Sequence, residues 1–143
     1  VGGGVGLAAA CDYCFATEQA SVKLSELSIG IGPFVIEPVV KRKIGLAAFA
    51  ELTLNATNWQ TAYWAKGKGL YAAVFETIKE LDVEVENLAQ KLSTYNPEAL
   101  LELKKVLWEG TENWKELLEQ RAEISGKLVL SEFTKKALQK YKK

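Results

Sequence analysis

The segment VGGGVGLAAACDYC, residues 1–14, places four glycines within its first six positions. Glycine has no Cβ, so such a segment lets another group approach the backbone closely. The run of leucine and alanine that follows favours a short helix over residues 4–10, and the next pattern predicts a buried strand over residues 12–16. The segment therefore indicates a helix that begins with glycines, which carry no side chain, and is followed directly by a strand.

The composition limits the classes of protein to which the chain can belong. Its 143 residues suffice for one domain with a core, and 48% hydrophobic with 25% charged residues are typical of a globular protein. Eighteen basic residues balance 18 acidic ones, which leaves no net attraction for nucleic acid. No apolar run approaches the ~20 residues of a membrane span, so we expect neither nucleic acid nor a membrane as partner.

Histidine is absent from the chain. Its absence excludes Ser–His and Cys–His catalysis and every metal site with a histidine ligand, so we expect no metal centre. Acid–base chemistry then has to come from carboxylate, lysine, tyrosine or cysteine side chains. Methionine is absent too, so Val1 cannot be a natural translation start, and we expect the sequence to be a fragment.

Two cysteines, Cys11 and Cys14, form a C-x-x-C pair. A lipidated cysteine would need a basic segment ahead of it, and a zinc site would need a second ligand pair. A redox pair would start a helix, whereas this pair follows one. We keep these as alternatives and expect two small buried residues in a reducing, cytoplasmic setting.

The middle of the chain is expected to alternate between extended and helical segments. Proline favours the first turn of a helix, glycine favours its end, and threonine is a good N-cap. The expected segments are a mostly extended stretch over residues 18–34, a helix from Pro38 to Gly45, a second over 46–54, a third over 62–66 capped by Thr61, and a strand over 70–75.

The region after Val83 is expected to be helical. Apolar residues at helical spacing and polar caps mark the individual helices. These marks are an apolar face at Val85, Leu88, Ala89 and Leu92, the cap and first turn Asn96–Pro97 of a helix that ends near Trp108, a face at Trp114, Leu117, Leu118 and Ala122, and the cap Ser131.

The glycine cluster itself has two physical interpretations. Glycines at a helix N-terminus let a ligand approach N–H groups that lack partners, and such groups favour negative charge. Aimed at a carbonyl oxygen that becomes an enolate, they form an oxyanion hole. The alternative is close packing of the helix against a strand, and the residues alone do not separate the two.

Residues 2–33, GGGVGLAAACDYCFATEQASVKLSELSIGIGP, resemble the signature of the enoyl-CoA hydratase/isomerase family, the crotonases. A later segment, AKGKGLY at residues 65–71, is similar to the family's A-x-x-x-G-L-V, and a helical region follows it. Within the family, the chain looks most like bacterial methylglutaconyl-CoA-type hydratases. The elements that carry the resemblance are the glycine triplet, the helix that ends in Cys11-Asp12, the strand, Ala20, Ser25-Glu26, Gly30 and Pro33.

This resemblance implies an α/β fold of the crotonase type, in which ββα turns form a spiral. Residues 1–82 would form the C-terminal part of the spiral core, and residues 83–143 a helical region for oligomerisation and for covering CoA. Family members carry a further N-terminal half with the first oxyanion donor and most of the CoA-binding loop. The resemblance also implies an acyl-CoA thioester as substrate, CoA as part of that substrate with no other cofactor, and a homotrimer or dimer of trimers.

The family's functional residues transfer to a small set of positions. The second oxyanion donor matches Gly3, and the second of two catalytic glutamates matches Glu26, but the first glutamate position holds Gly6. Phe34 stands where the family often has a glycine, so we expect it to change the shape of the pocket. The expected catalytic residues are Glu26 and Gly3, and the expected substrate-binding residues are Gly2, Gly4, Gly6, Pro33, Phe34 and Lys140.

The missing first glutamate leaves three functions open. Enoyl-CoA hydratases use both glutamates to hold and activate a water molecule, and hydration with Glu26 as acid and base is the first hypothesis. A double-bond isomerase can move one proton with one carboxylate, which is the second. The third is a paralogue without catalysis that binds acyl-CoA or only assembles, and Gly6 is the residue that suggests it.

Overall fold

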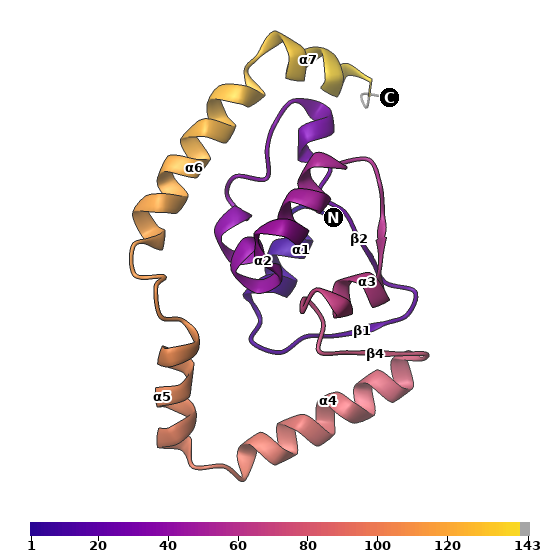
Figure 1. Ribbon diagram of the computed structural model, residues 1–143, viewed down its shortest axis with the longest axis vertical. Coiled ribbons are helices and arrows are strands. Elements are labelled where there is room, and N and C mark those ends of the chain that lie inside the picture. Colours follow the sequence, from indigo (N-terminus) through magenta and orange to yellow (C-terminus); the bar gives the residue numbers. More distant parts are fainter. Residues whose placement is uncertain (141–143) are drawn as a thin grey trace.

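The structure is a computed structural model that describes residues 1–140, so residues 141–143 lie outside the described part. The chain forms a packed N-terminal part and a series of helices that curves around it (Figure 1). We call this series, residues 78–140, the helical arm. The mixed α/β architecture agrees with the predicted fold class.

The first helix, α1 (Gly3–Ala10), starts one residue earlier than predicted. Its N-cap is Gly2, whose φ of 54° is in the region that favours glycine. The N–H of Gly2 donates to the carbonyl of Lys23, which ties the start of the helix to the segment after β2.

Two small sheets follow. β1 (Phe15–Thr17) pairs in parallel with β4 (Ala73–Phe75), and Ala16 lies opposite Val74. β2 (Ser21–Val22) pairs antiparallel with β3 (Gln60–Thr61). Parallel pairing of β1 and β4 requires a long connection, and two helices lie in it.

The predicted strand over residues 12–16 is wrong in its first half, because β1 begins only at Phe15. The reason is a competing set of hydrogen bonds. The ammonium group of Lys43 donates to the carbonyls of Cys11 and Asp12, at 2.9 Å each, so these groups are not available to a strand. The strand predicted over residues 70–75 is likewise shorter, since the N–H of Leu70 closes a helix by donating to Ala65.

The stretch predicted to be extended contains a short 3-10 helix, η1 (Glu26–Ile29). Ser28 folds the turn, because both its N–H and its hydroxyl donate to the carbonyl of Ser25. Gly30 ends the turn with a φ of 86°, a conformation that glycine adopts without strain. The correction matters for function, since the turn begins at Glu26.

The predictions for the next helices are confirmed. α2 (Glu37–Leu54) is interrupted at Gly45, whose φ of 79° and ψ of 163° are not helical, so it consists of two helical segments as expected. α3 (Ala62–Gly67) is capped by Thr61, whose hydroxyl accepts from the N–H of Trp64 at 3.1 Å.

The buried core lies entirely within the first half of the chain. It joins α1, the strands, α2 and α3, and its fully buried side chains are predominantly aliphatic. The core residues are Val5, Ala9, Ala16, Val22, Leu24, Val40, Ile44, Ala48, Leu52, Ala62, Ala65, Leu70 and Tyr71.

The arm consists of four helices, and the two caps predicted in it, Asn96 and Ser131, are confirmed. Thr77 and Glu80 form a capping box, Asn96 caps a helix that starts with Pro97, and Ser131 caps the last. None of the helices in the described chain is long and apolar enough to cross a membrane. The helices are α4 (Ile78–Ser93), α5 (Pro97–Leu107), α6 (Trp114–Val129) and α7 (Glu132–Gln139). Since α4 begins at Ile78, the boundary predicted between residues 82 and 83 falls inside it, and the division into two regions stays a prediction.

The arm is attached to the turn between α1 and β1 through Asp12. Its carboxylate accepts from the Lys104 ammonium at 2.5 Å and from the Trp108 indole N–H at 2.6 Å. The Arg42 guanidinium lies 5.0 Å from the centre of the Trp108 ring, in a cation–π contact.

The prediction that both cysteines are buried is wrong for Cys11, which is exposed. Its thiol donates to the Leu7 carbonyl in the last turn of α1, because the helix ends there and the chain bends outward to bring Asp12 to the arm. Cys14 is half-buried, and this burial raises the pKa of its thiol.

We predict that Asp12→Asn loosens α5 at neutral pH. The Lys104 ammonium and the Trp108 indole lower the pKa of the Asp12 carboxyl in the folded protein. The contact therefore stabilises the folded protein fully above the unfolded-state pKa of Asp12, about 3.9. This stabilisation is lost as the pH falls through the lower folded-state pKa. The pair is partly exposed, so we expect about 0.5 kcal/mol. Amide hydrogen exchange in α5 should be faster in the variant at neutral pH and equal to the wild type in strong acid. Glu102→Gln, which breaks an exposed pair within α5, is the control. Unchanged exchange in Asp12→Asn at neutral pH would contradict the prediction.

Candidate functional site

One face of α1 has bare backbone at two positions, Gly2 and Gly6, one helical turn apart. A Cβ on Gly2 would lie 2.8 Å from Glu26 Oε1, and a Cβ on Gly6 would lie 2.7 Å from Ile36 Cγ2. Both distances are too short for a real Cβ contact. The glycines are therefore needed for close packing, which is one of the two interpretations of the cluster.

The neighbouring Gly3 has a different environment. A Cβ on Gly3 would meet no atom within 4 Å, so the space beside it is open in the described chain. The N–H of Gly4 donates to the Val1 carbonyl at 3.1 Å, and that of Val5 to the Gly2 carbonyl at 2.9 Å. Within residues 1–140 the N–H of Gly3 donates to no backbone carbonyl. The second interpretation, an N–H free to meet a ligand, therefore fits Gly3.

Glu26 is half-buried at the start of η1, and its carboxylate lies against Gly2. Its Oε2 atom is buried and has no hydrogen-bond partner among the described residues. A buried carboxylate oxygen without a donor is costly unless a ligand completes it. The structure thus places the predicted acid–base residue against Gly2, the residue before the predicted oxyanion donor Gly3.

Ile36 occupies the space next to Gly6, the position that the resemblance assigns to the first glutamate. It is the N-cap residue of α2 and packs against the core. The face of α1 is therefore covered by a carboxylate at its first turn and by an aliphatic side chain one turn later.

Pro33 and Phe34 precede α2. Pro33 is buried, and the Phe34 ring lies over Gly32, where its Cζ atom is 2.5 Å from the position that a Cβ would take. Phe34 thus fills the space that Gly32 leaves free. Whether either residue contacts substrate stays a prediction.

Lys140 lies at the C-cap of α7, and its side chain is exposed. Its backbone N–H donates to the Ala137 carbonyl, as in an ordinary helix end. The structure brings α7 against η1, so Lys140 belongs to a helix that contacts the Glu26 turn.

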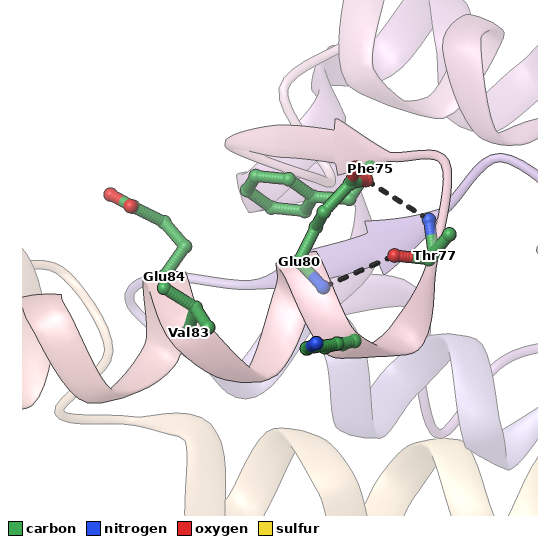
Figure 2. Close-up of a pocket in the computed structure, with 6 residues that line it drawn as sticks. Phe75, Thr77, Glu80, Val83 and Glu84 are labelled. Atoms are coloured by element: carbon green, nitrogen blue, oxygen red, sulfur yellow. Dashed lines mark hydrogen bonds between the residues drawn. The ribbon is translucent and has the colours of Figure 1, made fainter.

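Cavities lie in several other parts of the described chain. One of about 520 Å³ at the start of α4 contains Thr77 and Glu80, which Figure 2 shows turned toward each other in the capping box. Their polar groups are used by the helix and offer no convergent chemistry. Another of about 440 Å³ adjoins η1, where Ser25 and Ser28 line it together with Leu138 of α7.

The arrangement of Gly3 and Glu26 has a definite chemical capacity. An N–H without a partner at a helix N-terminus stabilises an oxygen that becomes negative, and a carboxylate with a free oxygen accepts and returns a proton. Sequence reasoning assigned these roles to both residues, and the roles stay predictions. It missed Ile36, since no pattern in the sequence pairs position 6 with position 36, and only the packing of α1 on α2 shows it.

Known proteins match most of the chain, and a family model matches all of it. The family model described as enoyl-CoA hydratase/isomerase matches residues 1–143. A protein named Delta(3,5)-Delta(2,4)-dienoyl-CoA isomerase, peroxisomal, of Arabidopsis thaliana is 32% identical over 116 residues, which are 78% of this chain and 40% of that protein.

Solved structures of enoyl-CoA hydratases and of a hydratase/isomerase also resemble the chain. An enoyl-CoA hydratase from Bacillus halodurans is 29% identical and has a TM-score of 0.87 over 97% of this chain and 56% of that one. An enoyl-CoA hydratase/isomerase from Pseudoalteromonas atlantica has a TM-score of 0.87 at 20% identity over 98% of this chain and 56% of that one, which shows the fold alone. The chain thus spans about half the length of these structures and less of the Arabidopsis protein.

We predict that Gly2→Ala destabilises the protein whereas Gly4→Ala does not. Alanine at position 2 has to adopt a φ of 54° with its Cβ 2.8 Å from Glu26 Oε1, a strain of about 1–3 kcal/mol. Alanine at position 4 meets no atom within 4 Å and suits the helix better than glycine by up to about 1 kcal/mol. Urea unfolding of both variants measures the difference. Equal midpoints for the two variants would show that Gly2 is not held in this packing.

Proposed function

The chain belongs to the enoyl-CoA hydratase/isomerase family, and on that premise we propose that it acts on an acyl-CoA thioester. In this proposal the N–H of Gly3 stabilises the thioester oxygen as it becomes an enolate, and Glu26 transfers the proton. The observation that carries the proposal is the free Oε2 of Glu26 beside the glycine N-terminus of α1.

The single carboxylate supports double-bond isomerisation best. Glu26 would take a proton from the carbon next to the thioester carbonyl, and the negative charge would move to the thioester oxygen. The same carboxylate would then return the proton at the far end of the shifted double bond, so that no water is consumed. Only one proton carrier is needed, and the aliphatic Ile36 beside Gly6 does not impede it.

Hydration is the second candidate. In that reaction, water adds its oxygen to one carbon of the double bond and a proton to the other. The similarity to the Bacillus halodurans hydratase favours it. A water molecule, however, has to be held and deprotonated, and Ile36 offers no hydrogen bond where a second carboxylate would stand.

Assembly and cellular location are further parts of the proposal. Exposed apolar side chains on α4 and α5, such as Leu92, Leu103 and Leu107, support a homo-oligomer, for which we propose a trimer or dimer of trimers. We propose a cytoplasmic location from the reduced cysteines, while the Arabidopsis relative is named as peroxisomal.

We predict that Glu26→Gln, in the protein expressed from its complete gene, lowers kcat by about 100- to 10,000-fold because the amide cannot accept the proton. KM should change little, since the thioester contacts do not involve this side chain. Steady-state assays with 3-enoyl-CoA, 3,5-dienoyl-CoA and crotonyl-CoA measure it, and Glu123→Gln on the exposed face of α6 is the matched control. Turnover near that of the wild type on every processed substrate would exclude Glu26 as the proton carrier. Binding without turnover in the wild type would favour a paralogue without catalysis.

We predict that Gly6→Glu adds hydration only when Ile36 is also made smaller. The new Cβ would lie 2.7 Å from Ile36 Cγ2, so Gly6→Glu alone should destabilise the protein without a gain in activity. Gly6→Glu with Ile36→Ala opens the space, and its ratio of crotonyl-CoA hydration to 3-enoyl-CoA isomerisation should rise at least about tenfold. Ile36→Ala alone is the control. An equal rise in Gly6→Glu alone would show that Ile36 does not exclude the second carboxylate.

A further inference from the structure

The position of the Glu26 carboxylate depends on packing rather than on hydrogen bonds. Its Oε2 atom has no partner among the described residues, and Oε1 lies against Gly2. No side-chain donor therefore restrains Oε2 from within the described chain. The orientation of the carboxylate follows from where the backbone of η1 places residue 26.

The backbone of η1 is closed at its far end by Gly30. The Gly30 N–H donates to the Leu27 carbonyl at 3.1 Å, and the N–H of the next residue, Ile31, donates to the carbonyl of Glu26 at 3.1 Å. These hydrogen bonds join Glu26 and Gly30 in one short turn. A displacement at Gly30 is therefore transmitted to Glu26.

Helix α7 packs closely against Gly30. A Cβ on Gly30 would lie 2.5 Å from Phe133 Cδ1 and 2.6 Å from Thr134 Oγ1. Position 30 therefore favours glycine for two reasons: a Cβ would clash with α7, and the φ of 86° is one that glycine adopts without strain. Figure 1 shows α7 returning to the packed part of the chain at the end of the arm.

Thr134 is the point at which the arm enters the interior. It is fully buried, and within the described part of the arm, residues 78–140, it alone is buried. Its backbone N–H and its hydroxyl both pair with the hydroxyl of Ser131, the N-cap of α7. The Ser131 hydroxyl therefore holds the Thr134 hydroxyl, and the side chain cannot turn away from Gly30 without losing that hydrogen bond.

We propose that Thr134 is a positioning residue for Glu26, and that α7, through its contact with Gly30, holds the η1 turn in place. The inference rests on the proposed function of Glu26. Glu26, the first residue of the turn, contacts Gly2, and Gly30 at its end contacts Thr134. Oε2 of the carboxylate has no hydrogen-bond partner among the described residues. Substrate binding does not require this contact, whereas proton transfer does, since it depends steeply on the position of the carboxylate.

The test compares truncations within α7, in the protein expressed from its complete gene. Thr134→Ala removes the atom that touches Gly30, and a misplacement of about 1 Å can cost up to about 100-fold in rate, so kcat should fall about 10- to 100-fold with KM little changed. Thr134→Ser keeps the hydroxyl and should retain near wild-type kcat. Glu132→Ala truncates an exposed residue of the same helix and breaks its pair with Lys135, and kcat should not change.

A double-substitution cycle separates positioning from general damage. If Thr134 acts through Glu26, then Thr134→Ala should lower kcat in the wild type but not further in Glu26→Gln. An equal loss in both backgrounds, or an unchanged kcat in Thr134→Ala, would overturn the proposal. If Glu26→Gln alone retains turnover, the proposed function fails instead, and this is a distinguishable result.

A second variant keeps the proposal testable if Thr134→Ala does not fold. Phe133 is 67% exposed, so Phe133→Ala removes the other contact with Gly30 at little cost to the core. It should also lower kcat more than it changes KM, and circular dichroism should show an intact fold. A folded Phe133→Ala protein with wild-type kcat would contradict the contact's role.

Discussion

Close packing against the bare backbone of α1 is the constraint on which the site depends. Glu26 reaches Gly2 and Ile36 reaches Gly6, each so closely that a Cβ on the glycine would force the neighbouring side chain to shift. Because the two glycines are four residues apart, they lie on the same side of the helix. One turn of helix therefore separates the carboxylate from an aliphatic wall.

This constraint connects the fold to the chemistry that we propose. The approach of η1 to Gly2 brings a carboxylate against the N-cap of α1. The next residue, Gly3, has the one N–H of the first turn without a backbone partner in the described chain. The approach of α2 to Gly6 fills the place of a second carboxylate with Ile36. Proton transfer by one residue fits such a site better than activation of water. The arm completes the arrangement, since α7 packs on the far end of the turn.

Local signals predicted the helices well and the strands poorly. The caps Thr61, Asn96 and Ser131 and the break at Gly45 act within a few residues, so they can be read from the sequence. The start of β1 depends instead on Lys43, about 30 positions away, which takes the carbonyls of Cys11 and Asp12. Tertiary hydrogen bonds of this kind leave no local pattern.

By itself, the sequence determined the family and the glycine N-terminus of α1, and it predicted Glu26 as the acid–base residue, because these rest on residue types at fixed spacing within residues 2–33. Only the tertiary structure decided that Ile36 covers Gly6 and that Thr134 closes on Gly30. Both contacts join segments that are far apart in the chain. Each contact fills the space beside a glycine, which has no Cβ, and a sequence does not show which distant side chain fills that space.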